Sequence, residues 1–218
     1  MQAKCQVDMT YGDISKQLFM FTIPILLSQI LQQFYNIADT AIIGRYIGTD
    51  ALAAIGSTGL LISVIVNFFI GLSTGVSAVI ANQFGANEYD KLKKSISTLL
   101  AVSVLLGIVF TIGSLIFMKP IINILQTPKG VYSLAIDYLK ICFLGITFQL
   151  LYNIGTAILR ALGNTKDPLY FLIFSCILNL ILDILFIVYF GWGVKGAAIA
   201  TLISQILATL LVMYKIMS

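Results

Sequence analysis

Residues 27–44, LSQILQQFYNIADTAIIG, place Asp39 inside an apolar run long enough to cross a bilayer. A second apolar run, PLYFLIFSCILNLILDILFIVYF at residues 168–190, carries Asp183 in the same way. A charged carboxylate at the centre of a bilayer costs about 3 kcal/mol even on lenient insertion scales, and such residues usually serve transport or ion binding. Both aspartates are therefore candidates for a functional site within the membrane.

The composition identifies the class of protein around these two residues. The chain has 218 residues, of which 59% are hydrophobic and only 10% are charged, whereas a soluble domain carries about 25% charged residues. We therefore expect an integral membrane protein. The net charge of +4 is small, and the basic residues stand in short loops, which sets membrane orientation and does not indicate nucleic-acid binding.

The residue types also limit the chemistry. The chain has no histidine, so any internal proton carrier must be a carboxylate. The three cysteines, Cys5, Cys142 and Cys176, show no metal-ligand spacing. We find no nucleophile–base pair and no phosphate-binding loop, and we expect neither enzyme activity nor a cofactor beyond H⁺ or Na⁺ as a coupling ion.

The hydrophobic pattern predicts an all-α membrane protein built as one six-helix bundle over residues 1–218. About 20 apolar residues span the hydrocarbon as a helix, and six segments meet this length. Their approximate ranges are 15–43, 51–84, 95–118, 134–162, 168–190 and 194–214.

The positive charges predict that both termini are cytoplasmic. An even number of spans leaves the two termini on one side of the membrane. With the N-terminus inside, eight basic residues are inside and five are outside, which agrees with the positive-inside rule. The inner set is Lys4, Lys16, Lys91, Lys93, Lys94, Arg160, Lys166 and Lys215, and the outer set is Arg45, Lys119, Lys129, Lys140 and Lys195.

Polar side chains recur at helical spacing on four of the predicted spans. On the first span they cover one arc of roughly 140°, which a lipid-facing helix would not carry. The residues are Gln29, Gln32, Gln33, Asn36, Asp39 and Thr40 on the first span, Gln149, Asn153, Thr156 and Arg160 on the fourth, Ser175, Asn179 and Asp183 on the fifth, and Thr201, Ser204, Gln205 and Thr209 on the sixth.

Four of these residues are predicted to meet at one depth. Asp39 lies about one turn before the outer end of its span, Asp183 about two turns before, and Thr201 about two turns after the start of its own. Asn179 is one turn deeper than Asp183 on the same face. Such a cluster can bind a proton or a hard cation such as Na⁺, because carboxylate, amide and hydroxyl oxygens suit both. The alternative is a structural role, in which the same groups hold the bundle together by interhelical hydrogen bonds.

Several short motifs, in order along nearly the whole chain, resemble multidrug and toxic compound extrusion (MATE) transporters. Each motif falls in or beside one of the predicted spans. They are IPI at 23–25 with LSQ at 27–29, ADT at 38–40 with Gly44 and Gly48, ALAAIG at 51–56, NQFGA at 82–86, LRALGNT at 159–165 and GAAIAT at 196–201.

This resemblance implies a function and a set of residues. It implies one lobe of a twelve-helix transporter that exports organic cations or lipophilic drugs by antiport with H⁺ or Na⁺, from the inner (plasma) membrane and without nucleic-acid partners. It implies a cation site at Asp39, Asn179, Asp183 and Thr201. We also expect residues lining a cavity, which are Gln29, Gln33, Asn36, Tyr138, Gln149, Asn153 and Gln205.

Only the N-terminal lobe of such a transporter is represented, so the resemblance implies a second six-helix lobe as a partner, from a C-terminal half or a second copy. Two alternatives remain at this stage. One is a lipid-linked oligosaccharide flippase of the same superfamily, which would carry basic residues in its cavity. The other is a scaffold or fragment that transports nothing.

Overall fold

The computed structural model describes residues 14–124, 128 and 130–218. Lys4, Cys5 and Lys129, which entered the counts above, lie outside the described residues. In the described part, α-helices and one π-helical segment follow one another along the chain. They are α1 (Ile14–Tyr46), α2 (Thr49–Gly85), α3 (Tyr89–Ile124), α4 (Tyr132–Leu144), α5 (Ile146–Ala161), α6 (Lys166–Asp183), η1 (Ile184–Tyr189) and α7 (Gly193–Met217).

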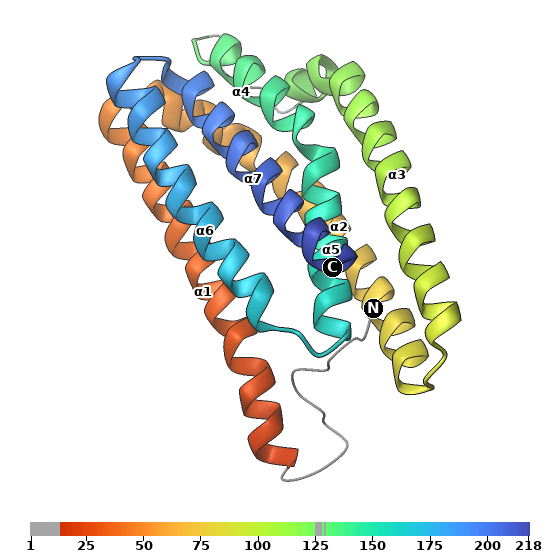
Figure 1. Ribbon diagram of the computed structural model, residues 1–218. Helices are drawn as coiled ribbons and strands as arrows, with labels where there is room; N and C mark the ends of the chain where they lie inside the picture. The colour runs from red at the N-terminus through yellow and green to blue at the C-terminus, as the bar shows by residue number, and fades with distance from the viewer. Residues whose placement is uncertain (1–13, 125–127, 129) are drawn as a thin grey trace.

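These elements form a bundle of six membrane spans, which confirms the predicted fold class. Five helices are each long and apolar enough to cross a bilayer, and α4 with α5 makes a sixth, broken span. Figure 1 shows α1 and α6 side by side at one edge of the bundle, α7 beside them, and α3 at the opposite edge. The two ends of the bundle are called here the Gly48 end, with the turn between α1 and α2, and the Asn87 end, with the turn between α2 and α3.

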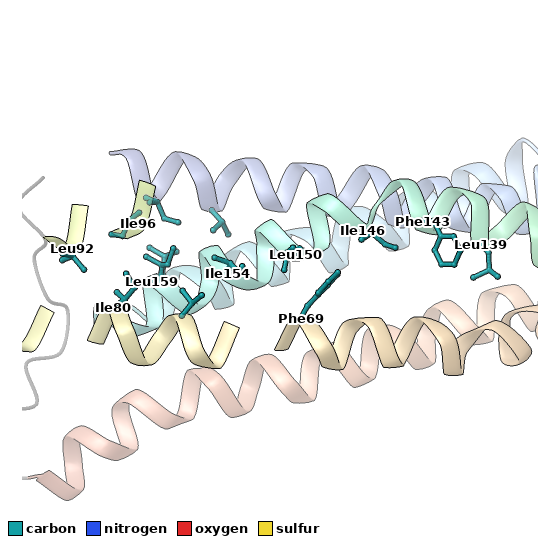
Figure 2. Close-up of a cluster of buried hydrophobic side chains, with 14 of the residues drawn as sticks. Phe69, Ile80, Leu92, Ile96, Leu139, Phe143, Ile146, Leu150, Ile154 and Leu159 are labelled. Atoms are coloured by element: carbon teal, nitrogen blue, oxygen red, sulfur yellow. The ribbon is translucent and has the colours of Figure 1, made fainter. Parts of the chain in front are cut away.

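The largest buried cluster is centred on α5 (Figure 2). Leu150, Ile154 and Ile158 of α5 are almost fully buried, and Phe69 and Ile80 of α2 pack in the same cluster. Inside a membrane the lipid is as apolar as these side chains, so close van der Waals contact holds the helices together rather than escape from water. The block formed by α2, α3, α5 and α7 is therefore the packed framework of the bundle.

Two glycines let α5 approach its neighbours closely. A Cβ added to Gly107 of α3 would lie 2.8 Å from Cα of Thr147 on α5, and one added to Gly155 of α5 would lie 2.4 Å from Cγ1 of Val212 on α7. Real Cβ atoms do not approach other heavy atoms this closely. Small residues at such positions are the usual means by which membrane helices pack against each other.

The fourth span is broken, whereas the sequence predicts one continuous helix over 134–162. Helices α4 and α5 meet at Gly145 with a bend of 46°. Gly145 faces α7 so closely that an added Cβ would lie 3.1 Å from Oε1 of Gln205 and 3.2 Å from Cδ1 of Leu202. The bend therefore depends on contacts with a distant part of the chain, which local hydrophobicity does not report.

The third span is longer than predicted. Pro120 was expected to end it near Met118, but α3 continues to Ile124. A proline inside a helix removes one backbone hydrogen bond, yet Ile122 beyond it is fully buried in the large cluster. Packing of this last turn against the core offsets the missing bond.

Two ion pairs attach α7 to its neighbours at opposite ends of the bundle. Near the Gly48 end, Nζ of Lys195 lies 3.2 Å from Oδ2 of Asp137 on α4. Near the Asn87 end, Nζ of Lys215 lies 3.0 Å from Oδ2 of Asp167 on α6. Such exposed pairs contribute little individually.

Candidate cation-binding site

The site begins on α6, where Asn179 and Asp183 share one helix face because they are four residues apart. Asp183 is fully buried and Asn179 is 1% exposed. When the amide of Asn179 is oriented to satisfy both of its neighbours, its nitrogen donates to Oδ2 of Asp183 at 2.7 Å and its oxygen accepts from the backbone N–H of Thr201 at 3.1 Å. Asn179 thus holds the carboxylate and connects α6 to α7.

Helix α7 contributes a hydroxyl group to the same place. Oγ1 of Thr201 lies 3.3 Å from the amide of Asn179 and 3.4 Å from the hydroxyl of Tyr35 on α1. The backbone of α7 approaches η1 closely because Gly196, five residues earlier, has no side chain: a Cβ there would lie 3.1 Å from Cβ of Phe186. Thr201 is therefore the junction of three helices.

Helix α1 supplies the second carboxylate. The carboxyl groups of Asp39 and Asp183 lie within hydrogen-bonding distance of each other. Within the described part of the chain, Oδ1 of each aspartate is buried and receives no hydrogen bond. Buried polar atoms are almost always hydrogen-bonded, so each of these two oxygens can accept a hydrogen bond or bind a cation.

The arrangement can hold one positive charge between two carboxylates. Both cannot be ionised at contact distance without strong repulsion, which a shared proton or a bound cation removes. The nearby oxygens belong to carboxylates, hydroxyls and an amide, the ligand types that hard cations prefer. Among the described residues, no three acidic, cysteine or histidine side chains are placed so that they could hold a metal ion together.

The remaining predicted residues of α1 lie on its open side. Gln29, Gln33 and Asn36 are exposed. Asn36 lines an open groove of about 510 Å³ together with Thr40 and neighbouring residues of α1 and α2. The polar arc of α1 is thus divided, because Asp39 at one edge of it turns into the bundle while the amides turn outward.

The other predicted cavity-lining residues do not join the carboxylates directly. Tyr138 of α4 is buried at the Gly48 end among apolar side chains. Asn153 donates to the carbonyl of Gln149 at 2.8 Å within α5, and both are half-buried. The side chain of Gln205 lies against Gly145 at the break in the fourth span.

Sequence reasoning did not select Tyr35, whose hydroxyl contacts Thr201. It is not part of the amide-rich arc, and a tyrosine in an apolar helix is usually an ordinary packing residue. Its position four residues before Asp39, which places both side chains on one face of the helix, could have identified it.

Comparison with known proteins identifies the family of this chain. The MatE family profile matches residues 24–185. The chain is 34% identical over 203 residues to the probable multidrug resistance protein YpnP of Bacillus subtilis, covering 93% of this chain and 46% of that protein. It is 32% identical to an FAD transporter of Shewanella oneidensis, covering 89% of this chain and 44% of that protein.

Solved structures of MATE transporters have the same fold. The chain superposes with a TM-score of 0.88 and 29% identity on an outward-facing MATE multidrug transporter of the MOP superfamily, covering 94% of this chain and 45% of that one. A six-span bundle of this kind is one lobe of a twelve-helix membrane transporter. The chain belongs to the MatE family, and it spans about half the length of the relatives it matches.

Proposed function

We propose that this chain is the N-terminal lobe of a cation-coupled exporter in which Asp39 and Asp183 bind the coupling ion, H⁺ or Na⁺. The observation that carries this proposal is the pair of neighbouring carboxyl groups, Asp183 fully buried and Asp39 partly buried, each with a buried oxygen that receives no hydrogen bond from the described residues. A purely structural pair would be satisfied within the bundle.

The coupling follows from where the site lies. Its residues come from α1, α6 and α7, so an ion bound there stabilises the arrangement in which these three helices are together. A ligand shifts a conformational equilibrium by the difference between its affinities for the two states. Loss of the ion leaves two carboxylates that repel each other, which favours separation of α1 from α6. Asn179 and Thr201 position the carboxylates in this scheme.

The cargo would bind where this lobe faces a second one. The groove between α1 and the start of α2 is lined by Asn36, Thr40 and apolar residues, with no basic side chain among them. Lipid offers no hydrogen bonds to such amides, so a second six-helix lobe and a water-filled cavity would cover this face. The absence of basic residues from the groove favours an organic cation or a lipophilic drug over the pyrophosphate of a lipid-linked oligosaccharide.

The orientation in this proposal has both termini in the cytoplasm and the Gly48 end outside the cell, in the plasma membrane. The basic residues of the first turns of α3 and of the last turn of α7 support it, since Lys91, Lys93, Lys94 and Lys215 all lie at the Asn87 end.

The test is substitution of either aspartate by asparagine. Asp39→Asn and Asp183→Asn should each weaken the binding of the coupling ion, Na⁺ or H⁺, to the purified chain at least tenfold. Each should also abolish drug efflux by the two-lobe transporter. Asp137→Asn, which removes a carboxylate of an exposed ion pair outside the site, is the matched control. Normal ion binding and efflux by both site variants would refute the assignment.

A further inference from the structure

A buried apolar layer covers the carboxylates on one side only. Six of its seven buried residues are at most 5% exposed and come from α1, α2, η1 and α7, and we call these six the apolar cap; the seventh is Tyr138 of α4, which is 9% exposed and carries a hydroxyl group. The members of the cap are Ile43, Ala51, Ile187, Val194, Ala197 and Ala198.

The cap lies one turn from each residue of the site, toward the Gly48 end. Ile43 follows Asp39 by four residues, and Ile187 follows Asp183 by four. Helix α7 runs in the opposite direction. Ala197, four residues before Thr201, belongs to the cap. Every site-bearing helix thus places an apolar, buried side chain between the carboxylates and the Gly48 end.

The step in the other direction is polar on the same three helices. Four residues toward the Asn87 end stand Tyr35 on α1, Asn179 on α6 and Gln205 on α7. One turn further along α6, Oγ of Ser175 donates to the carbonyl of Ser204 on α7 at 3.2 Å. On these three helices, hydrogen-bonding side chains therefore lie one turn from the carboxylates toward the Asn87 end, whereas the side chains one turn toward the Gly48 end are apolar.

We infer that the apolar cap is a one-sided seal. In this conformation the carboxylate pair exchanges its ion with the Asn87 side, and exchange with the Gly48 side requires Ile43 and Ile187 to part from Ala197. This inference rests on the proposed function, because it concerns ion access to the same site.

The physical basis is the cost of moving an ion through a dry constriction. A cation crossing the cap would lose its hydration shell and find no oxygen to replace it, and hydrophobic constrictions close pores in this way. The cap is also built to open. Two of its larger side chains come from α1 and from η1, and π-helical segments of this kind often occur at functional sites.

The seal can be tested by making it polar. The chain is reconstituted into liposomes, and passive H⁺ flux is measured with a trapped pH dye and Na⁺ flux with ²²Na⁺. Ile43→Ser and Ile187→Ser should each raise the flux of the coupling ion at least tenfold. Adding Asp39→Asn to either variant should return the flux to the unmodified level, because the leak passes through the carboxylates.

An exposed isoleucine of α6 is the matched control. Ile181 is 57% exposed, so Ile181→Ser makes the same chemical change outside the cap and should leave the flux unchanged. If a serine variant does not fold, the milder Ile187→Ala should give a smaller leak of the same kind. Ion binding by each variant verifies that its site is intact.

The outcomes separate this inference from the proposed function. If the unmodified chain shows no Asp39-dependent ion binding, both are wrong. If it binds the ion and the cap variants also bind it without any leak, the seal alone is wrong. A leak that persists after Asp39→Asn would likewise overturn the seal, since the ion would then be crossing elsewhere.

Discussion

The contact between α3 and α5 can be tested by adding one methyl group at Gly107. The alanine Cβ of Gly107→Ala would lie 2.8 Å from Cα of Thr147, a backbone atom that cannot rotate away. Carbon atoms are best separated by about 3.5–4.0 Å, so the two helices must part by about 1 Å. Overpacking of this kind costs about 1–3 kcal/mol, and alanine regains about 0.5–1 kcal/mol of helix propensity. We therefore expect a net loss of about 0–2.5 kcal/mol.

Gly113→Ala on the same helix is the matched control. No atom lies within 4 Å of a Cβ at Gly113, so this variant should be unchanged or more stable by up to about 1 kcal/mol. Unfolding of the purified chain by SDS in mixed micelles, followed by far-UV circular dichroism and by the fluorescence of its single tryptophan, Trp192, gives both values. Equal stability of the two variants would refute the close approach of α3 and α5.

Two smaller predictions concern the hydroxyl contact between α1 and α7 and the ion pair in the last turn of α7. Thr201→Val and Tyr35→Phe each remove a hydroxyl from the 3.4 Å contact between α1 and α7. Both should weaken ion binding by roughly three- to tenfold in a titration of the purified chain. Thr201→Ser keeps the oxygen and should bind the ion normally. Lys215→Met removes the ion pair with Asp167 and should lower the free energy of unfolding by about 0.2–1 kcal/mol. Ion affinity should not change, and a loss of affinity would show that this pair acts on the site.

Much of this molecule could be predicted from local sequence. The lengths of the apolar runs specify six spans, because a helix must satisfy its backbone internally within lipid. The position of Asp39 and Asp183 within those runs, with the helical rise per residue, also predicts that they lie at a similar depth. Depth needs only helix direction and spacing, and both are encoded locally.

Tertiary structure was needed wherever two distant segments meet. The break at Gly145 depends on the side chain of Gln205, some sixty residues later, and the last turn of α3 persists past Pro120 because Ile122 is buried in the core. The hydropathy of a segment depends only on its own residues and does not report either contact. The same limit hid Tyr35, whose role rests on the packing of α1 against α7.

The division is clearest at the carboxylates themselves. Periodicity identifies a polar arc on α1 but not its rotation, and the bundle turns Asp39 inward while Gln29, Gln33 and Asn36 stay exposed. The apolar cap likewise consists of isoleucine, valine and alanine side chains whose meeting across four elements local periodicity does not report. Composition and spacing set which groups the membrane must accommodate, whereas the packing of α1, α6 and α7 sets which of those groups face each other and from which side an ion can reach them.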